Sequence, residues 1–349
     1  MKKLFAVSFA FALILNLTIS PLADSASSKI KMVKANQLVA MLPDSDGVMT
    51  VDIKRFFDEA APMLFAADKN LFGEVAAKIE QANIAAGIDL RRFEYMAVGV
   101  LLSKVSEKDV DPRPVMIARG EVDTAELIAA AKKTAGGKFK EEHLAGKTMY
   151  IFASNDLFDK SGTDDQAAAA DAVTAKRAHV STEVAIAAID GATIVFGDPM
   201  RVRQTVEGNS GLGGEITALL NRKSFGIVNF AAKLPTGMGA FVPLDNDDLG
   251  KNIDSIQHVF GNMDVENQQT SFSLTARTQQ NQQAEELKQT LEVLQIMGKM
   301  LLGGSKRTDQ QLYARLIEKV KLSRNANEVS IDLALMQSDI EELLAVLKK

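Results

Sequence analysis

Residues 185–208 read AIAAIDGATIVFGDPMRVRQTVEG, and this stretch predicts three elements in succession. Two runs of apolar and β-branched residues, 184–189 and 192–196, flank an Asp-Gly pair at 190–191 that is typical of a two-residue hairpin turn. An Asp-Pro pair at 198–199 is then typical of a helix start, because Asp caps free backbone N–H groups and proline suits the first helical turn. The stretch therefore predicts an antiparallel hairpin that leads directly into a helix.

Further strands are predicted outward from this hairpin, in both directions along the chain. Their residues alternate between apolar and polar or are rich in β-branched types. The segments are 47–53, 93–102, 114–122, 147–152, 224–230, 256–265, 270–277, 320–323 and 328–336.

The predicted helices carry readable start and stop signals. Asp123 with Glu126 is typical of a capping box, and Gly136 ends that helix. Ser338 opens a last helix in the same way. The longest helix is predicted at 281–302, where apolar residues recur at steps of three and four and predict one continuous buried face. That face comprises Ala284, Leu287, Leu291, Leu294, Met297 and Leu301.

The two halves of the chain show the same order of elements. Each opens with a strand near a glycine, contains a strand that ends in Ala-Arg (at Arg119 and at Arg277), and closes with a hairpin that leads into a helix. We therefore predict an α+β fold of two related repeat units, 40–221 and 222–349, each an antiparallel or mixed sheet with helices packed on one face. An Ala- and Asp-rich insertion at 159–179 is predicted to be a mobile loop.

The N-terminus has the pattern of a secretory signal peptide. Lys2 and Lys3 precede an uncharged apolar run at 4–15, Pro21 follows, and Ala-Asp-Ser at 23–25 is a small-x-small cleavage pattern. The alternative is an uncut anchor, but twelve residues are too few to cross a bilayer, which needs about 20. Residues 1–25 are therefore predicted to be removed, which predicts a periplasmic or secreted protein with no transmembrane segment after cleavage.

A family resemblance becomes visible in the run from 114 to 208. It contains ARGEVDTAELIAAAKK at 118–133, EEHLAGKTMYIF at 141–152 and the hairpin and helix already quoted, with its Gly-Asp-Pro step at 197–199. This run resembles uncharacterised bacterial exported and envelope proteins that carry a domain-of-unknown-function label. The resemblance implies an exported α+β domain of repeated units, and it implies no catalytic residues.

Composition excludes several classes of function. The 349 residues include no Cys and no Trp, and the formal net charge is −5. Without cysteine, a disulfide scaffold, a thiol enzyme, an iron–sulfur protein and a Cys zinc site are excluded. An acidic chain with only 3 His and 3 Tyr does not fit a nucleic-acid binder. No cofactor, metal ion or nucleic acid is expected.

Local motifs do not supply a catalytic site either. Gly-Lys-Thr at 146–148 lacks the earlier glycine and the following helix of a phosphate loop. The glycine-rich stretch at 208–214 lacks the spacing of a nucleophile elbow. The carboxylates near 44–46 and 245–248 fit solvated turns better than a calcium loop, because no Glu closes either site. The sequence therefore favours a protein that is not an enzyme, and it predicts no catalytic residue.

One feature points to a contact surface. Four of the 17 Phe lie within 56–72, after the first strand, and an apolar segment occupies the matching place in the second half, at 234–244. Ordinary core packing is the alternative, but Phe and Met are also suited to a surface that contacts a partner or lipid. The candidate residues are Phe56, Phe57, Phe65, Phe72, Met238 and Phe241.

These observations leave three hypotheses for function. The first is an exported non-catalytic protein that binds a protein or an envelope component. The second is a carrier of a lipid or other apolar ligand, which requires an apolar cavity. The third is a hydrolase with an unrecognised site, which requires a cleft with convergent polar groups.

Export is directly testable by sequencing the N-terminus of the protein recovered from the periplasm or the medium. We expect the mature chain to begin between residues 24 and 29, because the cleavage pattern lies there. An intact Met1 in that material would instead favour an N-terminal anchor.

Overall fold

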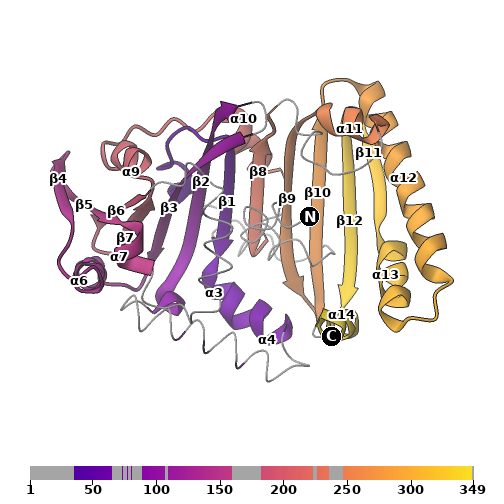
Figure 1. Ribbon diagram of the computed structural model, residues 1–349, viewed down its shortest axis with the longest axis horizontal. Helices are drawn as coiled ribbons and strands as arrows, with labels where there is room; N and C mark the ends of the chain where they lie inside the picture. The colour runs from indigo at the N-terminus through magenta and orange to yellow at the C-terminus, as the bar shows by residue number, and fades with distance from the viewer. Residues whose placement is uncertain are drawn as a thin grey trace. The chain divides into compact units, whose positions relative to one another are not determined.

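The structure, a computed structural model, describes residues 35–64, 89–106, 109–158, 182–222, 226–235 and 247–347, with the single positions 73, 77 and 80. The described residues form two compact units. Unit 1 contains those up to Phe57 and those from 73 to 217, and unit 2 contains 58–64 and those from 218 onward. Each unit combines an antiparallel sheet with helices, which confirms the predicted α+β class (Figure 1). The predicted insertion at 159–179 lies outside the described residues.

In unit 1, the sheet has the strand order β1-β2-β3-β7-β6-β5-β4, and every neighbouring pair is antiparallel. The strands are β1 Gly47–Asp52, β2 Phe93–Ser106, β3 Asp109–Gly120, β4 Lys140–Leu144, β5 Lys147–Ala153, β6 Glu183–Asp190 and β7 Thr193–Gly197. The helices are α3 Ile53–Arg55, η1 Phe56–Ala60 at the unit boundary, η2 Leu90–Arg92, α6 Thr124–Thr134, α7 Ser154–Phe158 and α9 Pro199–Val206. The next helix, α10 Gly214–Leu220, contains the boundary between the units.

The hairpin predicted from the opening stretch is confirmed. β6 and β7 pair across a turn at 191–192, and the Asp198 side chain accepts hydrogen bonds from the backbone N–H groups of Met200 and Arg201 at 3.0 and 3.2 Å. The strand β4 was not predicted, because its sequence KEEHL is polar and has no strand pattern. Its backbone pairs with β5 regardless of side-chain type.

The central strands of unit 1 are buried on both faces. On one face, α6 and α7 cover Ala118, Ile186 and Ile194. On the other face Ile117 and Val195 are fully buried, and α9 packs against β3, β5, β6 and β7. The prediction of helices on one face is therefore wrong for unit 1. The reason is visible in β6 and β7, whose nearly continuous apolar runs are typical of strands covered on both sides.

Unit 2 has the strand order β8-β9-β10-β12-β11, again antiparallel throughout. The strands are β8 Val228–Lys233, β9 Ile256–Glu266, β10 Gln269–Thr278, β11 Lys321–Asn325 and β12 Glu328–Met336. The helices are α4 Ala61–Leu64, α11 Asp247–Asp254, α12 Asn281–Gly303, α13 Thr308–Lys319 and α14 Gln337–Leu347.

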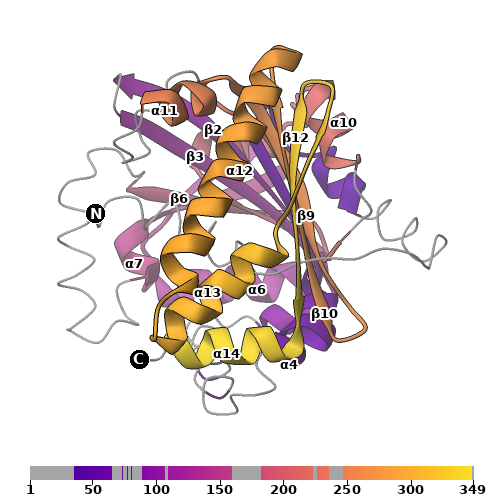
Figure 2. The same cartoon turned by 90° about the vertical axis from the view of Figure 1, so that its right-hand side faces the viewer.

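The sheet of unit 2 has one apolar and one polar face. Alternation along β10 places Phe272, Leu274 and Ala276 on the face that α12 crosses in Figure 2. The intervening residues of β10 are polar, and from Ser273 to Arg277 so are their partners on β12. For example, Ser273 donates a hydrogen bond to Asp332 at 2.7 Å. Period-two patterning therefore determines which side of this sheet the helices cover.

Gly261 lies where β9 and β10 pack closely, so a larger residue there should lower stability. A Cβ atom built on this β9 residue would lie 1.9 Å from the carbonyl oxygen of Ser273, far inside van der Waals contact. We therefore expect Gly261→Ala to destabilise the protein by about 3 kcal/mol, the upper end of the usual cost of overpacking, measured by urea denaturation.

Gly250→Ala in α11 is the matched control, because nothing lies within 4 Å of its built Cβ. Alanine restricts the unfolded chain more than glycine does, so this change should stabilise the protein by about 0.4–1 kcal/mol. A Gly261→Ala protein as stable as the wild type would contradict the packing described here.

Candidate binding surface

The longest helix among the described residues, α12, is buried only over its first half. The Gln280 backbone N–H donates to the Gln283 side chain at 2.9 Å and caps the helix start. Ala284 and Leu287 then pack against Ala276 and Val329 of the sheet. From 288 to 303, no residue is buried. The predicted continuous buried face is therefore wrong for this second half, which packs against α13.

Six apolar side chains of that second half face solvent, and we call them the apolar stripe. Met300 is 76% exposed and Leu301 is 74% exposed, and the other four are 39–58% exposed. Steps of three, four and seven residues place them on one side of the helix. The stripe comprises Val293, Leu294, Ile296, Met297, Met300 and Leu301. Contiguous exposed apolar surface of this kind is characteristic of a contact site.

The opposite side of the same helical segment is fixed to α13. The Gln295 side-chain amide donates to the carbonyl oxygens of Ile317 and Val320, each at 2.8 Å. At Gly298 a built Cβ would lie 3.0 Å from the Ile317 side chain, so the two helices approach closely here. α13 therefore holds the segment while leaving the stripe uncovered.

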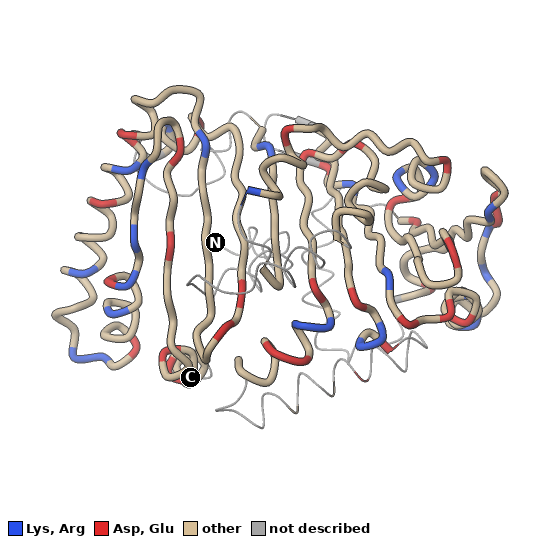
Figure 3. Tube along the Cα trace, turned by 180° about the vertical axis from the view of Figure 1, so that it is seen from behind, with Lys and Arg blue, Asp and Glu red and all other residues tan. Residues whose placement is uncertain are grey.

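The segment of chain that carries the stripe and follows it is basic. The segment 293–307 contains Lys299, Lys306 and Arg307 and no Asp or Glu. Figure 3 shows this charge as blue tube where α12 runs into α13. Lys299 lies 3.5 Å from Glu318, and Arg307 lies 2.7 Å from Asp309, but both pairs are largely exposed to water. Ion pairs in such positions contribute little energy.

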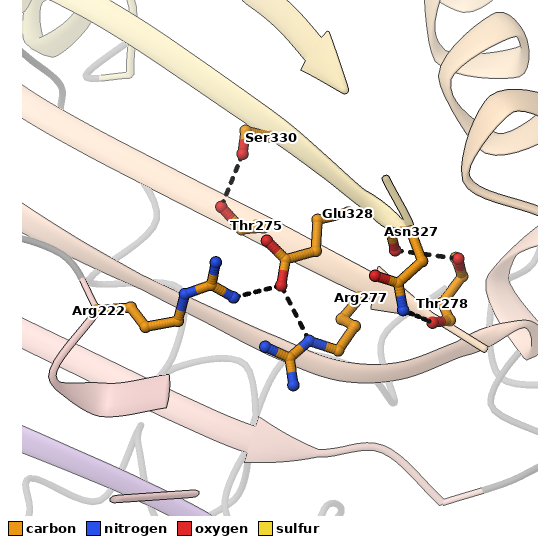
Figure 4. Close-up of polar contacts among 7 residues, drawn as sticks. All are labelled: Arg222, Thr275, Arg277, Thr278, Asn327, Glu328 and Ser330. Carbon is orange, nitrogen blue, oxygen red and sulfur yellow. Dashed lines mark hydrogen bonds and ion pairs between the residues drawn. The ribbon is translucent and has the colours of Figure 1, made fainter. Parts of the chain in front are cut away.

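A second cluster lies on the polar face of unit 2 (Figure 4). The Glu328 carboxylate accepts hydrogen bonds from Arg222 and from Arg277, the latter at 2.9 Å. Both guanidinium groups lie over the Phe260 ring, at 5.3 and 5.9 Å from its centre, within the range of cation–π attraction. Thr275 and Ser330 exchange a hydrogen bond of 2.8 Å beside them.

This arginine cluster surrounds a small depression of about 270 Å³. The Glu328 side chain, 13% exposed, occupies the position that a bound anion would take between the two guanidinium groups. Its charge is thus already used within the protein. The cluster therefore connects β10, β12 and the segment at 222. An anionic ligand would bind here more weakly than to two arginines without a carboxylate between them.

Unit 1 has a similar contact at the end of its own hairpin. Arg119 of β3 donates to the Thr193 hydroxyl at 2.7 Å and to the Asp190 carboxylate at 3.0 Å. Burial opposes ionisation of Asp190, but hydrogen bonds from the Ala192 N–H, Thr193 and Arg119 outweigh it and lower the pKa of that carboxyl. The group stays ionised, as a structural anchor requires.

Arg201 of α9 is a further buried cation, only 1% exposed. Its guanidinium donates to the Ser45 hydroxyl at 2.6 Å and to the carbonyl oxygen of Asp44. Burial lowers the pKa of Arg201, while the nearby carboxylates of Asp44, Asp198 and Asp46 oppose that change. Arg201 fastens the segment before β1 to α9 and lies too deep to reach a ligand.

The phenylalanine surface predicted from sequence is described only in part. Phe56 and Phe57 are partly buried, and their rings meet edge to face at 5.4 Å. Phe65, Phe72, Met238 and Phe241 lie outside the described residues. Among the described residues, no three His, Asp or Glu side chains gather in a way that could hold a metal ion.

Comparisons with known proteins give little guidance. No family model matches the chain, and no curated protein matches it. Among solved structures it is similar to three crystal forms of a protein called TP0453, with 8–9% identity and TM-scores of 0.40–0.42. These matches cover 88–89% of this chain and 96–97% of TP0453. A likeness this distant carries no argument about function.

The structural role of the arginine cluster is testable. Glu328→Gln should lower the free energy of unfolding by about 1–3 kcal/mol, because Arg222 and the partly buried Arg277 lose their shared counter-charge. Glu318→Gln is the matched control, since Glu318 is 69% exposed and pairs with Lys299 at 3.5 Å. The control should change stability by less than about 0.5 kcal/mol. Equal effects in urea denaturation would contradict the structural role.

Proposed function

We propose that this protein is exported, has no catalytic activity, and binds a protein or an envelope component through the apolar stripe. The observation that carries the proposal is the exposure of six apolar side chains on one side of α12. Burying them would remove the equivalent of about three and a half whole side chains from water. At roughly 1.5–3 kcal/mol for each fully buried side chain, this is worth about 5–10 kcal/mol before the costs of association.

Export is supported by the N-terminal sequence, with its basic start, apolar run and small-residue cleavage pattern. The proposed location is the periplasm or the exterior. We also propose that the chain belongs to the group of uncharacterised envelope proteins that its run 114–208 resembles. No helix among the described residues is both long and apolar enough to cross a membrane.

We further propose that the two units are copies of one ancestral unit. In support, the order β1-β2-β3-β7-β6 in unit 1 corresponds to β8-β9-β10-β12-β11 in unit 2, with β4 and β5 as an addition to unit 1. Arg119 and Arg277 stand near the ends of corresponding strands. Their cross-strand partners, Thr193 and Glu328, are the first residues of corresponding strands.

The carrier and hydrolase hypotheses have less support. A cavity of about 1200 Å³ lies among the end of α12, α13 and α14, but half of the residues that line it are charged, including Lys306, Arg315 and Glu342. An apolar ligand would need a predominantly apolar lining. The arginine clusters at Arg119 and Arg277 are satisfied by partners within the protein, so neither of these two described clusters supports a hydrolase.

Site-specific photo-crosslinking in living cells tests the contact. A photoreactive amino acid in place of Met300 should form adducts with an envelope component. The same amino acid in place of Met336, which is 55% exposed at the end of β12, is the matched control and should form few. The absence of adducts at position 300, or equal labelling at both positions, would contradict the proposed contact.

A further inference from the structure

From the shape and charge of the apolar stripe, we propose that its occupant is a lipid surface that carries anionic headgroups. This inference rests on the proposed function and names the partner class for the same surface. The alternatives, a second copy of this chain or another protein, are outcomes of the test below.

The chemistry of the stripe fits lipid better than a protein partner. Its side chains are Val, Leu, Ile and Met only, with no hydrogen-bonding group among them. Binding energy in protein interfaces concentrates in Trp, Tyr and Arg anchors that fill matching pockets. The stripe has no such anchor and projects from the outer side of a helix. A deformable acyl layer can accommodate a projecting aliphatic ridge without a preformed pocket.

The dimensions fit insertion into one face of a bilayer. From Val293 to Leu301 the helix rises about 12 Å, which is less than half of the roughly 30 Å hydrocarbon core. A helix that lies in the interface buries its apolar side about 5–10 Å deep, a depth that side chains of this length reach. The stripe is therefore suited to lie in the surface and not to cross it.

The distribution of charge favours anionic headgroups. The chain as a whole has a formal net charge of −5, so an anionic membrane would repel most of its surface. The segment 293–307 departs from this average, with Lys299, Lys306 and Arg307 and no acidic residue of its own. Lys306 and Arg307 are exposed and follow five and six residues after Leu301, the last residue of the stripe. Cations at this place would attract headgroup phosphates while the stripe enters the acyl layer.

The stripe is also presented in a fixed conformation. The two hydrogen bonds from Gln295 to α13, and the close approach at Gly298, hold the segment helical without any contribution from the stripe itself. Docking on a membrane would thus require no folding step, and little conformational entropy would be lost.

Vesicle co-sedimentation of the purified, processed protein tests the inference. We expect binding to vesicles of phosphatidylcholine mixed with phosphatidylglycerol, and weaker binding to phosphatidylcholine alone. The double variant Met300→Gln/Leu301→Gln should bind at least about tenfold more weakly, because its two most exposed apolar groups are lost. Met336→Gln is the matched control and should bind like the wild type.

A charge variant separates the two contributions. Lys306→Gln should weaken binding to the anionic vesicles roughly fivefold and leave binding to phosphatidylcholine unchanged. All substituted side chains are solvent-exposed, so circular dichroism should show a retained fold.

Three outcomes would overturn the inference. The first is a wild-type protein that does not sediment with either vesicle, and the second is a double variant that binds as well as the wild type. In the third, the wild type forms a dimer that Met300→Gln/Leu301→Gln dissociates, with no vesicle binding. That result would identify a second copy of this chain as the occupant, and the stripe would still be a binding surface, as the proposed function states. An absence of crosslinking at position 300 in cells would contradict both this inference and the proposed function.

Discussion

Ala284 and Leu287 of α12 pack against Ala276 and Val329, and this contact ties the longest described helix to the sheet of unit 2. It depends on the alternation of β10 and β12, which turns small and aliphatic residues toward the helix and polar residues away from it. Because the contact uses only the first half of α12, the second half is held by α13 and keeps one side open. The candidate binding surface is thus a consequence of a helix that extends beyond its own core.

In both units, an arginine side chain on the sheet is held by hydrogen bonds and an ion pair within the protein. In each, an arginine near the end of the third strand bonds to the first residue of the neighbouring strand, Thr193 in one case and Glu328 in the other. In unit 1 it also bonds to Asp190, the last residue of β6. A guanidinium group held by a carboxylate in this way is satisfied, directional and costly to remove. The strongest charges on these sheets therefore serve the fold, and the exposed apolar surface is left as the feature that internal packing does not explain.

Prediction from sequence succeeded where the deciding interactions are local. The hairpin around 190–191, the Asp198 cap and the strand at 328–336 each depend on neighbouring residues along the chain. The structure has all three, with the hairpin turn one residue later than predicted, at 191–192. β4 was missed because its side chains carry no strand pattern, and only pairing with β5 makes it a strand. The helix-covered faces of unit 1 were misjudged because coverage on both sides depends on α9, whose packing position is not a local property.

The α12 helix shows the same division within one element. Its start near 281, its length and its apolar periodicity follow from the sequence alone, since caps and helical spacing are properties of adjacent turns. Periodicity shows that apolar residues share a side of the helix, but it does not show whether anything covers that side. The tertiary structure decided that Ala284 and Leu287 meet the sheet while Met300 and Leu301 meet solvent. The physical reason is that burial requires a second surface, and the position of that surface depends on residues far away in the chain.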